Sequence, residues 1–283
     1  MNENQIIEYI KSCERMITFF KKILDDHSIA PEPTTETEKL AELTNLRMLA
    51  RSDAWPEAVP PDLICADNEK GTQARGILRE FITTSIQNKR FLDFGCGEGY
   101  ITKSAKKDFG ALFSVGYDIK QNSLWDETAI FSNDFKKIKE HAPYDVIMAF
   151  DVLDHAKNPI EALKQMKLVR EQIYGRIFVR FHPWTSRHGS HLYKDLNKAY
   201  LHLIFDDKEL ASLGLMNQET NKSINPLEEY RIWIKEAGLT VLEEKPIIQP
   251  IEIFFTKNPI LARRIKNYNN EIMELQFVDY ILK

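Results

Sequence analysis

A glycine-rich turn between a predicted strand and a predicted helix is the feature that most restricts what this chain can fold into. In the stretch FLDFGCGEGY, glycines at positions 95, 97 and 99 follow the apolar run RFLDF (90–94). Glycines at such a turn let the backbone approach a ligand closely, and the helix that follows presents unpaired N–H groups. A dinucleotide fingerprint needs glycine where this chain has Tyr100, and no G-K-[ST] of a P-loop follows. The pattern that remains is D-x-G-x-G-x-G, which begins at Asp93.

The sequence around this turn alternates between short β-rich runs and amphipathic segments from about residue 72. This alternation predicts a parallel sheet with crossover helices. We expect strands over residues 90–94, 112–118, 129–133, 144–150, 175–181, 239–247 and 272–283. We expect helices over residues 101–107, 159–171 and 227–238, the last of them ended by Gly238.

The N-terminal part reads as helical, and two later segments interrupt the alternating rhythm. Apolar residues at three- and four-residue intervals predict a helix over residues 6–24, and a proline-containing linker (27–39) separates it from leucines with helical spacing over 40–49. We therefore expect residues 1–70 to form a helical extension or cap and residues 71–283 to form the main domain. Residues 182–225 are expected to form a lid insertion, and residues 250–268 a smaller insertion.

Composition limits the class of protein more than its function. The chain has 283 residues, of which 43% are hydrophobic and 28% charged, as in soluble globular proteins. It has neither a signal sequence nor an apolar run near the ~18 residues that span a bilayer, so we expect a cytoplasmic location and no membrane partner. The three cysteines are widely spaced, which favours reduced thiols over disulfides or a zinc ribbon. A net charge of −4 gives no general attraction to nucleic acid.

The D-x-G-x-G-x-G turn, together with acids after the next two strands, resembles the class I S-adenosylmethionine-dependent methyltransferases. The resemblance implies an α/β fold with a doubly wound, seven-stranded, mostly parallel sheet and an antiparallel last strand. It also implies S-adenosyl-L-methionine as cofactor, with the glycine turn around its amino acid part, Asp118 on the ribose hydroxyls and Asp134 facing the adenine amine. An ionised carboxylate suits Asp118 to this role because its two oxygens can accept from two adjacent hydroxyls. The candidate cofactor-binding residues are Asp93, Gly95, Cys96, Gly97, Gly99, Asp118, Ile119, Asn133, Asp134, Phe135 and Phe150.

Candidates for a catalytic base follow the fourth and fifth expected strands. In an open α/β sheet, ligands bind outside the carboxyl ends of the strands, which is where Asp151, His155 and His182 are expected. These three residues are the catalytic candidates. A histidine titrates near neutral pH and can take a proton from a hydroxyl, although His155 fits a helix-capping or packing role equally well.

The run VRFHPWTSRHGSHLYK (179–194) concentrates three of the seven histidines, with arginines and a lysine among them. This charge bias predicts a small, anionic acceptor and favours O-methylation, whereas nucleic acid is the less favoured partner because a wide basic surface is missing. The candidate acceptor-binding residues are Arg180, Trp184, Arg187, His188, His191 and Tyr193. The N-terminal helices are a candidate homodimer surface.

Three other functions are alternatives to this one. The [DNS]-P-P-[YFW] motif of amine-methylating nucleic acid enzymes is absent, because D-V-L-D follows the fourth strand. The sequence Asp151-x-x-Asp154-His155 loosely resembles the Glu-x-x-Glu-His metal site of RNA ribose 2′-O-methyltransferases, but both glutamates are replaced, and we expect no metal. A noncatalytic S-adenosylmethionine sensor or scaffold is the other alternative, and equilibrium binding without turnover would identify it.

Overall fold

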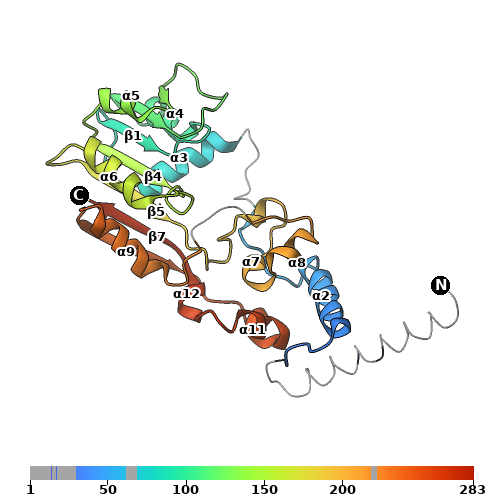
Figure 1. Ribbon diagram of the computed structural model, residues 1–283. Helices are drawn as coiled ribbons and strands as arrows, with labels where there is room; N and C mark the ends of the chain where they lie inside the picture. Colours follow the sequence, from blue (N-terminus) through green and yellow to red (C-terminus); the bar gives the residue numbers. More distant parts are fainter. Residues whose placement is uncertain (1–13, 15–16, 18–29, 62–68, 218–221) are drawn as a thin grey trace. The chain divides into compact units, whose positions relative to one another are not determined.

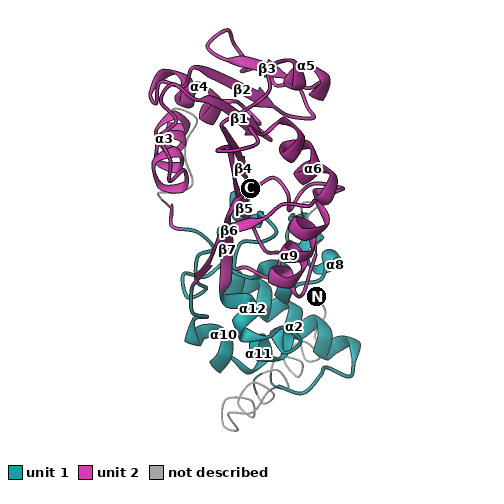
Figure 2. Ribbon diagram, turned by 90° about the vertical axis from the view of Figure 1, so that its left-hand side faces the viewer, with its two compact units in different colours: residues 1–59, 187–218, 249–274 teal, residues 60–186, 219–248, 275–283 magenta. Residues whose placement is uncertain are grey.

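The computed structural model describes residues 14, 17, 30–61, 69–217 and 222–283. The chain divides into two compact units, each assembled from three stretches of sequence (Figure 2). Unit 1 comprises residues 1–59, 187–218 and 249–274, and unit 2 comprises residues 60–186, 219–248 and 275–283. The expected helix over 6–24, apart from Glu14 and Ile17, lies outside the described residues, and so do Cys13 and Cys65.

Unit 2 contains a seven-stranded sheet with the order β3-β2-β1-β4-β5-β7-β6. Figure 1 labels β1, β4, β5 and β7 among these strands. The first five strands pair in parallel, whereas β7 is antiparallel to both of its neighbours. The fold class and the antiparallel last strand expected from the sequence are confirmed. The strands are β1 (Arg90–Phe94), β2 (Phe113–Tyr117), β3 (Ile130–Ser132), β4 (Val146–Phe150), β5 (Arg176–Phe181), β6 (Val241–Ile248) and β7 (Leu275–Leu282).

Successive side chains of the strands pack on opposite faces of this sheet. Leu92 and Ile177 belong to one buried cluster with residues of three helices, and Phe91 and Phe178 belong to a second cluster with residues of two others. Both faces of the central strands are therefore covered, as parallel strands require. The first cluster involves α5 (Phe135–Glu140), α6 (Pro159–Val169) and α9 (Pro226–Glu236), and the second involves α3 (Lys70–Phe81) and α4 (Tyr100–Lys107).

Two boundaries in the described part of the chain differ from the sequence expectation by more than two residues. The expected strand over 272–283 begins only at Leu275, because α12 (Asn270–Glu274) occupies the residues before it, and the Asn269 side chain accepts a hydrogen bond from the Glu271 backbone N–H at 3.0 Å. The expected linker is helical from residue 36 onward. There Thr35 and Glu38 form a capping box that starts a helix four residues before the leucine pattern does.

Unit 1 is helical and combines the three segments that the sequence shows as separate additions. Its core includes Trp55, whose ring contacts those of Phe205, Phe254 and Phe255 at centroid distances of 6.2, 5.6 and 5.8 Å. These aromatic contacts join all three segments. The helices are α2 (Glu36–Ala50), η3 (Leu192–Lys194), α7 (Leu201–Ile204), α8 (Asp207–Ala211), α10 (Ile253–Lys257), α11 (Pro259–Ile265) and α12.

A membrane-spanning helix is not found in the described part of the chain, where each helix is too short or too polar to cross a bilayer.

Candidate active site

The glycine turn lies at the carboxyl end of β1 and is fixed by the neighbouring strand. The backbone N–H groups of Gly95 and Cys96 both donate to the Tyr117 carbonyl oxygen, at 2.7 and 2.9 Å. Gly95, Gly97 and Gly99 have φ angles of +84°, +48° and +81°, a region that only glycine adopts without strain. At Gly95 a Cβ atom would also lie 2.3 Å from a methyl carbon of Val152. The turn therefore needs glycine at this position for two independent reasons.

Asp118 follows β2 and turns its carboxylate toward the glycine turn. Its Oδ2 accepts a hydrogen bond from the Gly97 N–H at 2.9 Å, and its Oδ1 accepts one from the Lys120 N–H at 3.1 Å. Each carboxylate oxygen can accept a further hydrogen bond. The half-buried carboxylate is thus oriented by the backbone and retains acceptor capacity.

Asp93, the first residue of the motif, is buried beneath the turn. The Thr102 hydroxyl of α4 donates to its carboxylate at 2.7 Å, and the Ser114 hydroxyl donates to the Thr102 carbonyl at 2.6 Å. Burial raises the pKa of Asp93 to about 7, and the negative charge of Asp118 adds to this shift. Burial likewise raises the pKa of the Cys96 thiol, followed by the charges of Asp93 and Asp118, so this free cysteine stays protonated at neutral pH.

The residues after β3 are arranged around the start of α5. Asp134 caps this helix, because its Oδ1 accepts from the Lys136 N–H at 2.8 Å. Asn133 is exposed, as is Ile119 after β2, whose side chain is 77% exposed. The Phe135 ring packs edge-on against Tyr117, with 5.5 Å between the ring centroids.

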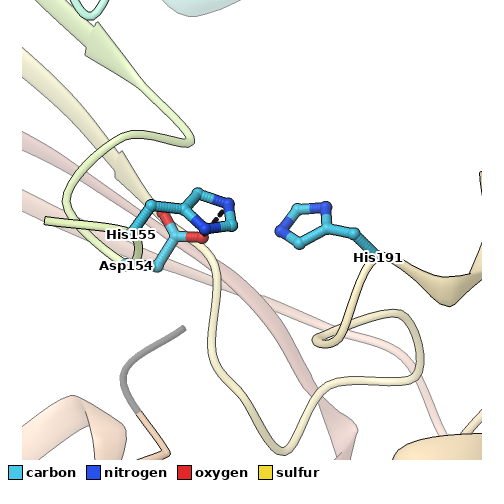
Figure 3. A group of neighbouring side chains, drawn as sticks. All are labelled: Asp154, His155 and His191. Atoms are coloured by element: carbon cyan, nitrogen blue, oxygen red, sulfur yellow. Dashed lines mark ion pairs between the residues drawn. The ribbon is translucent and has the colours of Figure 1, made fainter. Parts of the chain in front are cut away.

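The segment after β4 turns sharply and carries an acid-histidine pair. Asp151 adopts φ of +52°, and three residues later Asp154 is buried. The Nε2 atom of the exposed His155 lies 3.2 Å from the Asp154 carboxylate, as the dashed line in Figure 3 marks. The same figure draws His191, which belongs to unit 1.

Arg180, near the end of β5, is held by a carboxylate and by aromatic rings. Its Nε and Nη2 donate to the two carboxylate oxygens of Asp279 at 2.6 and 2.7 Å, across the β5–β7 ladder. Its guanidinium carbon lies 5.3, 4.8 and 4.7 Å from the ring centroids of Phe81, Phe150 and Phe277. Burial opposes the charge of Arg180, but the hydrogen bonds and charge of Asp279 outweigh it, and the charges of Asp151 and Glu80 add to them, so the pKa of Arg180 is raised.

His182 lies two residues beyond Arg180, and its ring contacts Phe277 at a centroid distance of 5.1 Å. Since side chains two residues apart share a face of a strand, both point to the face that α3 covers. Phe150 is the direct partner of Arg180 on β4. The structure thus brings Phe150, Arg180 and His182 together at one end of the sheet.

The rest of the histidine run is divided between the two units. Trp184 belongs to unit 2, where the Lys222 amino group lies 4.9 Å from its ring centroid. In unit 1, Arg187 pairs with Glu252 at 2.6 Å and also donates to the Glu57 carbonyl oxygen. The rings of His188 and His191 lie 6.2 and 6.0 Å from that of Tyr193. His188 and His191 lie in the loop before η3, whereas Tyr193 lies within η3.

Sequence reasoning missed several residues of this region. Helix α3 was not predicted, since two glycines within KGTQARGILREF weaken its helical signal, and so Lys70 and Phe81 were overlooked. The sequence places Asp279 and Phe277 only within an expected strand. Their nearness to Arg180 depends on a pairing 99 residues apart in the chain, for which the sequence carries no local signal.

The family model described as "Methyltransferase domain" matches residues 68–244, which contain β1 to β5 and the glycine turn. The chain belongs to this methyltransferase family. It is an S-adenosylmethionine-dependent enzyme of class I, with S-adenosyl-L-methionine as its cofactor, as the resemblance implied.

Solved structures of other methyltransferases are similar to this enzyme at low identity. One, from Listeria monocytogenes, is described as a putative S-adenosylmethionine-dependent methyltransferase and is 14% identical, with a TM-score of 0.46 over 75% of this chain and 97% of its own. Another, from Archaeoglobus fulgidus, is 15% identical, with a TM-score of 0.45 over 75% and 94%. A third, coclaurine N-methyltransferase bound to N-methylheliamine and S-adenosylhomocysteine, is 13% identical, with a TM-score of 0.46 over the full length of both chains.

Proposed function

We propose that this methyltransferase transfers the methyl group to an oxygen atom of a small, anionic acceptor. When bound, S-adenosylmethionine supplies an electrophilic methyl group on a sulfonium. The contribution of the chain is then to hold the cofactor and the acceptor oxygen in line and to remove a proton where the acceptor is a hydroxyl.

The proposed cofactor site extends along the carboxyl ends of β1, β2 and β3. The amino acid part of the cofactor would face the glycine turn, which includes Gly95, Cys96, Gly97 and Gly99. The buried Asp93, near the end of β1, would support this turn. Asp118 would accept from the ribose hydroxyls, for which its oriented carboxylate retains acceptor capacity. The adenine would lie among Ile119, Asn133, Asp134 and Phe135, and Phe150 would stand beside the reacting methyl group.

The observation that carries the acceptor proposal is the fixed guanidinium of Arg180. The Nε and Nη2 atoms of Arg180 donate to Asp279. The N–H groups of Nη1 would then bind an anionic acceptor. A guanidinium held by two hydrogen bonds and three rings needs little reordering to bind a carboxylate or phosphate. Its neighbour on β4 is Phe150, so an acceptor held by Arg180 would lie close to the proposed methyl position.

We propose His182 as the base for a hydroxyl acceptor, with His155 and Asp151 as the other candidates. His182 shares Phe277 with Arg180, which places its imidazole within the same group of side chains. The other side chains proposed to contact the acceptor are Trp184, Arg187, His188, His191 and Tyr193.

A homodimer through the N-terminal helices is also proposed, and light scattering on the purified protein would test it.

The experiment that tests the acceptor class uses cofactor labelled in its methyl group and a panel of carboxylates, phosphates, neutral alcohols and amines. We expect label in anionic acceptors, identified by mass spectrometry of the products. Arg180→Gln should abolish this preference. Where the labelled oxygen is a hydroxyl of an anionic acceptor, His182→Ala should lower turnover by roughly 10²- to 10⁴-fold with cofactor affinity unchanged. Labelling confined to neutral alcohols would refute the anionic acceptor.

A second candidate acceptor is an amine, and one observation favours it. Three carboxylates, those of Asp279, Asp151 and Glu80, act on Arg180 strongly enough to raise its pKa. Among these four groups the carboxylates outnumber the guanidinium, which would attract a protonated amine; the amine would lose its proton to a base before it attacks the methyl group. The same panel separates the two classes, since an amine acceptor would take the label and the carboxylates would not.

A further inference from the structure

A pocket of about 230 Å³ lies between the start of α3 and the glycine turn. Its walls include Lys70 and Gln73 from α3, and Cys96, Glu98 and Tyr100 from the turn and the start of α4. All of these residues belong to unit 2. The pocket therefore opens beside the same turn that is proposed to hold the amino acid part of the cofactor.

Two opposite charges face each other in this pocket. The Lys70 amino group lies 2.7 Å from a carboxylate oxygen of Glu98, and the side chains are 27% and 38% exposed. The amino group also lies 5.8 Å from the centroid of the Tyr100 ring. An ion pair this exposed contributes little to stability, since solvent screens it and two long side chains must be ordered. Both groups can therefore change partners at small cost.

We propose that Lys70 and Glu98 form a clamp for the charged amino acid end of the cofactor, with Lys70 binding the α-carboxylate and Glu98 the α-ammonium. This assignment rests on the proposed placement of the cofactor at the glycine turn. A zwitterion offers one positive and one negative group, so each member of the Lys70–Glu98 pair exchanges its present partner for an equivalent one. The total charge of the pocket is unchanged by the exchange, and each new contact is a charge-assisted hydrogen bond.

The position of Glu98 in the turn supports the clamp. Glu98 stands between Gly97, whose N–H is bound by Asp118, and Gly99, whose N–H donates to the Cys96 carbonyl at 2.8 Å. The backbone on either side of Glu98 is thus fixed. Lys70 begins a helix whose other end is anchored by the buried residues Leu78 and Phe81. Two elements packed in one unit therefore present the two charges.

The test compares two ligands that differ only at the amino acid end. S-adenosylhomocysteine carries the α-ammonium and α-carboxylate, whereas 5′-methylthioadenosine has the same adenosine and thioether without them. We expect Lys70→Met and Glu98→Gln each to weaken S-adenosylhomocysteine by roughly 10- to 100-fold, because each removes a charge-assisted hydrogen bond. Binding of 5′-methylthioadenosine should change by less than about twofold in both variants. Isothermal titration calorimetry gives both dissociation constants.

Lys107→Met is the matched control, because Lys107 is an exposed lysine of α4 outside the pocket, and it should alter neither affinity. Thermal unfolding of each variant confirms that it is folded. If Lys70→Met and Glu98→Gln leave the ratio of the two dissociation constants at the wild-type value, the clamp is wrong, whether both affinities fall together or neither does. Failure of the cofactor placement has a different signature, since Asp118→Ala would then affect neither ligand.

Discussion

Asp93 illustrates how one buried group links the glycine turn to the pH dependence of stability. An aspartate in the unfolded chain titrates near its usual value of 3.8, whereas burial raises the pKa of Asp93 to about 7. Between these values the folded protein binds a proton that the unfolded chain has lost. Stability should therefore decrease as the pH rises from about 4 to about 7, by on the order of 4 kcal/mol from this residue, and level off above.

Asp93→Asn should remove this part of the pH dependence, because an amide can accept the Thr102 hydrogen bond but does not titrate. Urea unfolding at several pH values between 4 and 8 measures the difference between the two proteins. The variant should gain stability relative to the wild type as the pH rises. Two profiles that stay parallel would show that Asp93 keeps an ordinary pKa.

Asp279 should orient Arg180 for the acceptor. In Asp279→Asn the guanidinium loses one charged acceptor, and we expect the KM of an anionic acceptor to rise about tenfold while cofactor affinity is unchanged. The matched control is Glu244→Gln on β6, which breaks a similar two-hydrogen-bond pair with Arg231 of α9. If Asp279→Asn and the control both leave the KM unchanged, the Arg180–Asp279 pair links β5 to β7 but does not orient Arg180 for the acceptor.

The Asp154–His155 pair bears on the metal-assisted alternative. Our proposal needs no divalent ion, so turnover should survive treatment with EDTA followed by desalting. Loss of turnover that returns with added magnesium or manganese would favour the RNA ribose 2′-O-methyltransferase alternative. A panel that includes short RNA acceptors would then be the next measurement.

At the scale of elements, the glycine turn and the segment after β4 fit together through Gly95 and Val152. Gly95→Ala places a methyl group 2.3 Å from a Val152 methyl carbon and also puts a non-glycine residue at φ of +84°. Either the segment after β4 or the glycine turn must move, so cofactor affinity should fall at least tenfold. Adding Val152→Ala removes both methyl contacts but leaves the Cβ of residue 152 at 3.0 Å and the backbone strain of about 1–2 kcal/mol, so the double variant should recover only part of the affinity. Full recovery, or no loss in Gly95→Ala, would contradict this account of the turn.

The sequence predicts elements well where one local pattern decides them. All seven strands lie where the sequence predicts them. The central strands are read from short apolar runs, because strands buried on both faces need such runs, whereas the edge strand β6 is mostly exposed. Asp118 and Asp134 follow β2 and β3 as expected, since an acid after a strand is read directly from the sequence. Helix α3 has apolar residues at helical spacing, at positions 74, 77, 78 and 81, but its two glycines weaken the signal, so neither α3 nor its Lys70 is among the expectations. The Arg180–Asp279 pair depends on the β5–β7 register, which no local signal specifies.

At the scale of the whole molecule, unit 1 is assembled from three distant stretches that share a buried charge network. The Glu42 carboxylate is 1% exposed and pairs with Arg263 and with Arg264, and Arg264 also pairs with Glu209 at 2.9 Å. The sequence shows these charges as ordinary helix residues, so it could not predict that they hold one unit together.

Glu42→Gln should destabilise unit 1 by on the order of 3 kcal/mol, because two arginines lose their buried counter-charge. Hydrogen exchange followed by mass spectrometry should show faster exchange in peptides from α2 and α11, with the sheet of unit 2 unchanged. Uniform acceleration across both units would mean that the network stabilises more than unit 1. Unchanged exchange in α2 would mean that it stabilises neither.

The central claim is that the cofactor binds along the carboxyl ends of β1 to β3 with its ribose on Asp118. The most direct measurement is calorimetric binding of S-adenosylhomocysteine to wild type, Asp118→Ala and Asp126→Ala, a matched loss of an acid from the same loop. Asp118→Ala removes two charge-assisted hydrogen bonds to the ribose, each worth about 1.5–3 kcal/mol before the gain from rehydration. We therefore predict a dissociation constant raised by roughly 100-fold or more in Asp118→Ala and by less than about twofold in Asp126→Ala. Equal dissociation constants in wild type and Asp118→Ala would contradict the claim and place the ribose elsewhere.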